Sequence, residues 1–111
     1  IPKGKSYCYI QSVANKGKLS CGVTYIVRDS EADLWMDTYQ GEEMKDKIVT
    51  AISRLPEDHP LRSAEISQGK KNKNKWAWSI RKSFDRNDYG LVKWYADGLL
   101  AIYTAVEEME L

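Results

Sequence analysis

Residues 32–55 read ADLWMDTYQGEEMKDKIVTAISRL, and their hydrophobic period changes partway along. Between Ala32 and Tyr39, apolar and polar side chains alternate, which is typical of a strand with one buried face. Between residues 42 and 55 the apolar residues recur at helical spacing, as Met44, Ile48, Ala51, Ile52 and Leu55. Gly41 separates the two patterns, and Pro56 ends the second. The stretch therefore predicts a strand followed by an amphipathic helix.

Two more strands are predicted before this stretch. Ser6–Ala14 and Leu19–Arg28 both alternate in polarity. Asn15-Lys16-Gly17-Lys18 between them carries turn chemistry, because Asn and Gly tolerate a left-handed backbone. Residues 29–31 form a second turn, so three consecutive antiparallel strands are expected.

The sequence after the first helix predicts two strands and a second helix. Arg62–Ser67 is a short strand candidate, and Trp76–Lys82 alternates large apolar residues with small or charged ones. The two Trp residues of the latter strand share one face and are expected in the core. A final helix is expected from about Tyr89 to Glu110, capped by Asn87 or Asp88.

Chain length and element order together predict one α+β domain. With 111 residues, 42% of them hydrophobic, the chain can bury one core but not two, so residues 1–111 are expected to form a single domain. The order βββαββα predicts a mainly antiparallel sheet of about five strands with helices 42–55 and 89–110 packed on it. Gly98 in the second helix indicates close packing, because Gly costs about 1 kcal/mol there relative to Ala.

Several functional classes lack the residues that they require. No apolar run approaches the ~20 residues of a membrane span. The first residues, IPKGK, contain neither a signal-peptide core nor an initiator Met, which predicts an intracellular protein, cytoplasmic or nuclear, whose start has been trimmed. The single histidine, His59, lies in a predicted surface loop, and the sequence contains no nucleophile motif that a catalytic histidine would activate. Phosphate-binding glycine motifs are also missing, so no cofactor and no metal are predicted.

The two cysteines predict neither a disulfide nor a zinc site. In the register that the 15–18 turn sets, Cys21 lies opposite Ser12 and Cys8 opposite Tyr25. The two thiols are then not cross-strand partners, and two thiolates alone do not complete a zinc site. Both cysteines are therefore expected to be buried and to act as small packing residues.

The formal net charge of +1 hides a strong segregation along the chain. Residues 28–67 sum to −5, whereas residues 68–86 sum to +6. The basic segment opens with a polar stretch, residues 68–75, that is expected to be a flexible loop. Its cations are Lys70, Lys71, Lys73, Lys75, Arg81, Lys82 and Arg86. Because cations beside aromatic rings supply phosphate contacts next to stacking surfaces, the leading prediction is a non-catalytic nucleic-acid-binding domain, for RNA or DNA, that uses residues 68–86.

A second hypothesis assigns the chain to protein recognition. The predicted strands carry more aromatic residues than a small core needs, namely Tyr7, Tyr9, Trp35 and Tyr39. Exposed aromatic side chains on a sheet serve base stacking and protein contact equally well. The acidic region 28–67, or this aromatic sheet face, would make the domain a small protein-interaction or inhibitor module.

Two stretches resemble the ribonuclease H-like family. Lys75-Trp76-Ala77-Trp78-Ser79-Ile80 is similar to the aromatic-rich fifth strand of bacterial ribonucleases H, and Tyr95-Ala96-Asp97-Gly98-Leu99 resembles the stretch of the last helix whose Asp binds metal. The order of three strands, a helix and a fourth strand matches the opening of that fold. The resemblance implies a degenerate ribonuclease H-like fold, and an unrelated α+β domain with a solvated Asp97 is the alternative.

The same resemblance implies a third function, a metal-dependent nuclease. Its acids would be Glu43 (or Glu42), Glu65 and Asp97, with Mg²⁺ as the cofactor. The chain departs from the family where the first strand has no Asp. Two divalent cations ~4 Å apart require several convergent carboxylates, and this set leaves them under-neutralised, so a non-catalytic domain is favoured.

Overall fold

The computed structural model describes residues 7–27, 29–85 and 87–111. Its five strands are β1 (Tyr7–Ala14), β2 (Leu19–Ile26), β3 (Glu31–Thr38), β4 (Glu65–Gln68) and β5 (Trp76–Ser83). The two helices are α1 (Gly41–Ser53) and α2 (Tyr89–Glu108), and two 3₁₀ turns are η1 (Asn15–Gly17) and η2 (Pro60–Ser63).

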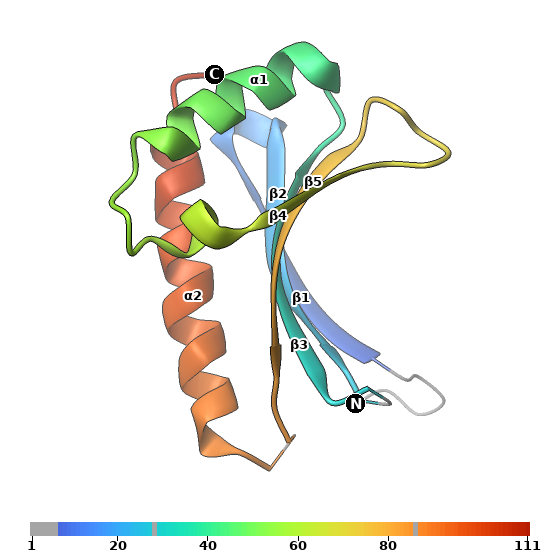
Figure 1. The fold of residues 1–111 in the computed structure, drawn as a ribbon, viewed down its shortest axis with the longest axis vertical. Helices are drawn as coiled ribbons and strands as arrows, with labels where there is room; N and C mark the ends of the chain where they lie inside the picture. The colour runs from blue at the N-terminus through green and yellow to red at the C-terminus, as the bar shows by residue number, and fades with distance from the viewer. Residues whose placement is uncertain (1–6, 28, 86) are drawn as a thin grey trace.

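The strands form one sheet with the spatial order β1-β2-β3-β5-β4, and every pairing in it is antiparallel. Both α1 and α2 lie on the same side of this sheet (Figure 1). The predicted α+β fold with five strands and the order βββαββα is therefore confirmed. The opposite face of the sheet, called the open face, is covered by no helix in the part of the chain that the structure describes.

The first hairpin has the register expected from its turn. Cys8 pairs with Tyr25, and Ser12 pairs with Cys21, so the two cysteines are not cross-strand partners. Cys21 is completely buried, and burial, followed by the nearby Asp37 carboxylate, raises the pKa of its thiol to about 11. Cys21 is accordingly a packing residue with an unreactive thiol.

Side chains alternate most clearly along β3. Its even-numbered residues are at most 1% exposed and face the helices; they are Ala32, Leu34, Met36 and Thr38. Trp78 of β5 is paired with Met36 and is equally buried, and Trp76 packs against the same cluster. The expected burial is thereby confirmed for Trp78, whereas Trp76 lies on the same face but is only partly buried. Ile48 and Ile52 of α1 and Ile102 and Val106 of α2 belong to the same core.

The fourth strand begins later than predicted. Pro60–Ser63 forms the 3₁₀ turn η2, so the predicted strand Arg62–Ser67 is wrong in its first half, and β4 runs from Glu65 to Gln68. The reason is local: Pro60 at the first turn position fixes φ, and the amide of Leu61 donates to His59 Nδ1 at 3.2 Å. Leu61 is thereby buried in the core.

Side chains cap both ends of α2. Asp88 Oδ1 accepts from the amide of Gly90 at 2.8 Å, which confirms one of the two predicted caps. At the other end, Asn15 Nδ2 donates to the carbonyl oxygens of Val106 at 2.9 Å and Met109 at 2.7 Å. The β1–β2 turn thus supplies donors to carbonyls that a helix end leaves unpaired. The helix ends at Glu108, two residues before the predicted limit.

Gly98 is where α2 approaches the sheet most closely. It is buried, and a Cβ atom built on it would clash with Cδ1 of Leu34 on β3. Leu34 is itself only 1% exposed, so a methyl group added at position 98 would have to displace a buried side chain. The close packing predicted at this glycine is therefore present.

Gly98→Ala should lower stability, although Ala favours helix by about 1 kcal/mol. Overpacking a tight core costs about 1–3 kcal/mol, and this cost exceeds the helical gain. Urea unfolding followed by circular dichroism measures the difference. Adding Leu34→Val should recover part of the loss, because it removes the clashing methyl group. A single variant as stable as the wild-type protein would contradict the packing described.

Candidate binding site on the open face of the sheet

The odd-numbered residues of β3 face away from the helices. They are Glu31, Asp33, Trp35 and Asp37, and three of these four carry a carboxylate. On β5 the neighbouring side chains of this face are small or basic: Ala77, Ser79 and Arg81. The alternation of side chains along β3 thus places three acidic residues and one tryptophan in a row on the open face. We call these four residues the acidic row.

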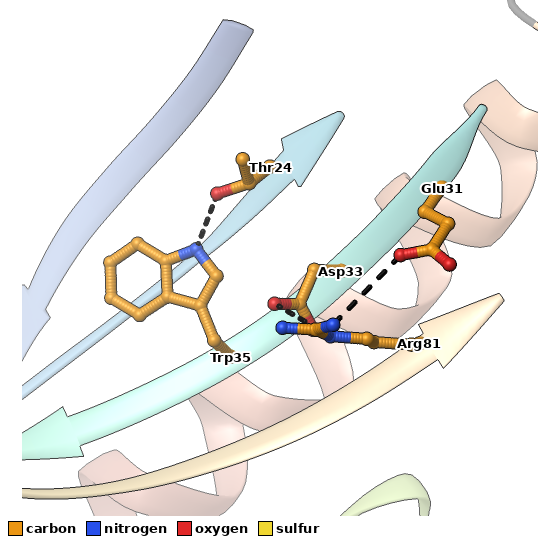
Figure 2. A network of polar contacts seen from close by, with 5 residues as sticks. All are labelled: Thr24, Glu31, Asp33, Trp35 and Arg81. Carbon is orange, nitrogen blue, oxygen red and sulfur yellow. Dashed lines mark hydrogen bonds and ion pairs between the residues drawn. The ribbon is translucent and has the colours of Figure 1, made fainter. Parts of the chain in front are cut away.

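Trp35 lies flat over β2 rather than standing away from the sheet. Its indole nitrogen donates to Thr24 Oγ1 at 2.9 Å (Figure 2). Gly22 makes this position possible, because a Cβ there would lie 2.7 Å from Trp35 Cζ2 and would also clash with the carbonyl oxygen of Ile10. The ring is therefore held by a hydrogen bond on one side and by a glycine beneath it.

Asp33 faces Arg81 across the β3–β5 pair (Figure 2). Arg81 Nε lies 3.9 Å from Asp33 Oδ2, and Arg81 Nη1 lies 3.9 Å from Glu31 Oε2. The side chain of Arg81 is 63% exposed, whereas that of Asp33 is only 16% exposed. Such long contacts to an exposed guanidinium contribute little free energy, so Asp33 is a poorly compensated, largely buried acid.

The two inner carboxyl groups of the row have raised pKa values. Burial raises the pKa of Asp33 to about 6; Arg81 opposes this shift and Glu31 adds to it. Burial also raises the pKa of Asp37, and Lys75 opposes the shift. In both cases the cause is loss of hydration, which disfavours the charged form.

Each of these two carboxyl groups has one oxygen without a hydrogen-bond partner. Asp33 Oδ1 and Asp37 Oδ1 are buried, and no donor among the described residues reaches either atom. Both side chains line a hollow of about 360 Å³ on the open face, together with Trp35, Ser67, Lys75, Ala77, Ser79 and Arg81. A pair of acceptors beside an indole ring is suited to binding a cationic donor from outside the domain.

The structure distributes the predicted basic residues over three places. Lys70, Lys71 and Lys73 lie exposed in the connection from β4 to β5, which projects from the body (Figure 1). Backbone hydrogen bonds order this connection. In one of them, the amide of Gly69 donates to the carbonyl oxygen of Lys75 at 2.8 Å.

The remaining cations of that set do not join these three. Lys75 and Arg81 line the hollow of the open face. Lys82 points to the helix side, with its Nζ 5.1 Å from the Phe84 ring centroid. Arg86 lies outside the described residues. Only the three lysines of the β4–β5 connection therefore form a basic group by themselves.

The three acids suggested by the nuclease resemblance lie apart. Glu43 is on α1, Asp97 is on α2, and Glu65 is on β4 in the row of Ser79 and Trp35. Among the residues that the structure describes, no three His, Cys, Asp or Glu side chains converge well enough to hold a metal ion. The described part of the chain therefore gives these three acids no common site.

Sequence reasoning placed Trp35 and Asp37 on one strand face but did not select Asp33 or Asp37 as site residues. The available signal was the alternation of carboxylates with buried residues along 31–38. The contact of Asp33 with Arg81, 48 residues later, depends on β3 and β5 being neighbours, and that strand order was not predicted.

Comparison of the chain with protein-family models, with curated proteins and with solved structures finds no match. Neither helix of the described chain is long and apolar enough to cross a membrane.

Asp33→Asn should stabilise the protein at neutral pH. Because the folded-state pKa of about 6 exceeds the ordinary 3.8, the folded protein binds this proton more tightly than the unfolded chain does. The contribution of Asp33 to stability is therefore full below pH 3.8 and is lost as the pH rises through 6. Asn does not titrate, so the free energy of unfolding of the variant should exceed that of the wild-type protein by an amount that grows between these two pH values.

Urea unfolding at a series of pH values tests this expectation. Glu65→Gln, which removes an exposed carboxylate from the same face, is the matched control and should show a smaller pH-dependent difference. An Asn variant that is less stable than the wild-type protein at about pH 8 would show that the Arg81 contact outweighs burial.

Proposed function

We propose that this domain is a protein-interaction module whose open sheet face binds a basic segment of a partner protein. The observation that carries the proposal is the pair of buried, unpaired Oδ1 atoms of Asp33 and Asp37 on either side of Trp35. A buried acceptor without a donor costs free energy, and a guanidinium or ammonium group from a partner would remove that cost. The indole face between them adds a surface on which a cation is attracted.

The spacing of the two acids suggests the conformation of the partner segment. Asp33 and Asp37 are four residues apart on a strand, which corresponds to about 13 Å. An extended segment with basic residues four positions apart presents two cations with that separation on one face. Such a segment could lie along β3 with its charges at the two carboxylates and its middle over Trp35.

The charge of the open face favours a cationic partner over a phosphate backbone. Across this face Glu31, Asp33, Asp37 and Glu65 outnumber the basic side chains of Lys75 and Arg81. Like charges brought together at an interface cost binding free energy and reject wrong partners. The same row of acids that attracts arginine therefore discriminates against nucleic acid at this face.

A peptide with arginines at its first and fifth positions, separated by Ser and Thr, tests the proposal by isothermal titration calorimetry. The double variant Asp33→Asn/Asp37→Asn should weaken binding at least tenfold, because each charge-assisted hydrogen bond contributes about 1.5–3 kcal/mol. Affinity should also fall as the pH is lowered through 6, where Asp33 becomes protonated.

Two controls separate this site from general acidity. Moving the second arginine to the fourth position of the peptide places the two cations on opposite faces of an extended segment. This peptide should therefore bind more weakly than the peptide with arginines at positions one and five. Glu43→Gln/Asp97→Asn removes the same number of charges from the helices and should leave the affinity unchanged. Equal affinity for both peptides, or equal loss in both double variants, would contradict the proposal.

Nucleic-acid binding by the β4–β5 connection is the second candidate function. It is favoured by Lys70, Lys71 and Lys73, which are exposed and form no ion pair with any residue that the structure describes. This connection projects from the body of the domain (Figure 1), so phosphate can reach its exposed lysines from the solvent. RNA and DNA are both possible ligands of such a site.

A salt titration against single-stranded, duplex and hybrid nucleic acid tests this candidate. Affinity should fall by about 0.7–0.9 log units per log unit of salt for each phosphate contact. The triple variant Lys70→Ala/Lys71→Ala/Lys73→Ala should remove most of this binding, whereas Lys82→Ala should not. Binding that is unchanged in the triple variant would exclude the connection, and Mg²⁺-dependent cleavage would instead support the nuclease prediction.

A further inference from the structure

Among the residues that the structure describes, β1 is an edge of the sheet, and its own sequence lacks the features that usually protect an edge. Its sequence, YCYIQSVA, contains no charged residue and no proline, although 30% of the chain is charged. It pairs with β2 in an unbroken register over all eight residues, so no bulge interrupts it. Natural edges are usually blunted by charge, proline, a bulge or shortness, because unpaired backbone groups can recruit another strand.

The opposite edge of the same sheet is protected. β4 has only four residues, begins with Glu65, and is followed closely by Lys70 and Lys71. The contrast within one sheet indicates that the bare edge at β1 is specific to that strand rather than a general property of the chain.

Both faces of β1 expose large apolar side chains. Ile10, on the helix side, is 63% exposed, and Val13, on the open face, is 57% exposed. Tyr9, also on the open face, is 59% exposed. The exposure of Ile10 further shows that the helix layer does not cover the middle of β1, so another strand can approach there without meeting a helix.

We propose that β1 pairs with β1 of a second copy of this chain, in antiparallel orientation, to form one continuous sheet of ten strands. A second copy fits this edge because a strand without charges meets no like charge when it faces itself. Closed two-fold symmetry is also the commonest arrangement of identical chains. The contact satisfies the edge amides and carbonyls of both copies and covers the apolar side chains beside them.

The symmetry restricts the register of this pair. A two-fold axis perpendicular to the sheet keeps both helix layers on one side, so each residue must face a residue of the same side. The axis therefore passes through a residue position, with Gln11 or Ile10 facing itself. We assign Gln11, because Tyr9 of each copy then faces Val13 of the other, and aromatic and β-branched residues are a favourable cross-strand pair.

Cysteine cross-linking measures this register directly. With Cys8 replaced by Ser, Gln11→Cys should form an intermolecular disulfide under mild oxidation, because directly opposed Cβ atoms lie within the range that a disulfide bridges. Ile10→Cys in the same background should cross-link much less. Predominant cross-linking of Ile10→Cys would support the dimer and move its axis by one residue, and no cross-linking at either position would overturn the proposal.

Sedimentation velocity over a concentration series supplies the independent test. The wild-type protein should reach twice the mass of one chain, and Val13→Lys should shift it to the single-chain mass, because two buried lysines would face the opposing strand. Ile66→Lys, which charges an exposed apolar residue of the other edge strand, is the matched control and should remain dimeric. A wild-type protein of single-chain mass throughout, or equal dissociation of both variants, would overturn the proposal. Circular dichroism of each variant verifies that the fold is kept.

Discussion

The alternation of side chains along β3 is the constraint on which the rest of this structure depends. Because β3 is central, its even-numbered residues have to fill the space under two helices, and its odd-numbered residues have to face the other way. A slip of one residue would bury Asp33 and Asp37 in the core and expose Leu34. The core and the acidic row are therefore two results of one register, and Gly98 against Leu34 fixes that register from the helix side.

The residues of the open face do not maximise the stability of the domain. Neutral polar side chains at Asp33 and Asp37 would avoid the desolvation that raises both pKa values, and the exposed Arg81 returns little of that cost. Trp35 is held over Gly22 by its hydrogen bond to Thr24, on a face that no helix of the described chain covers. Rigid aromatic groups and uncompensated buried acids are typical of sites arranged for a partner rather than for stability.

The sequence predicted the local features of the fold well and the contacts between distant strands poorly. Alternation and turn residues predicted the β1–β2 register and the position of Trp76 and Trp78 on the core face of β5, since these depend on neighbours in the chain. The start of β4 was missed because Pro60 and His59 favour a short 3₁₀ turn over an extended strand. The pairing of Asp33 with Arg81 needs the order of the strands, and summing charges by segment conceals it. Lys82 could have been separated from Arg81, because adjacent strand residues point to opposite faces.

The hydrogen bonds from Asn15 to the end of α2 have a consequence for how the chain folds. They join residues separated by 91 and 94 positions, so nearly the whole polypeptide must be in place before they can form. Contacts across such separations carry a large loop-closure entropy and form slowly, whereas the β1–β2 hairpin closes locally. We therefore expect the β1–β2 hairpin to form before α2 docks onto the sheet. The docking of the last turns of α2 onto it would be the late step that turns a partly ordered sheet into a closed domain.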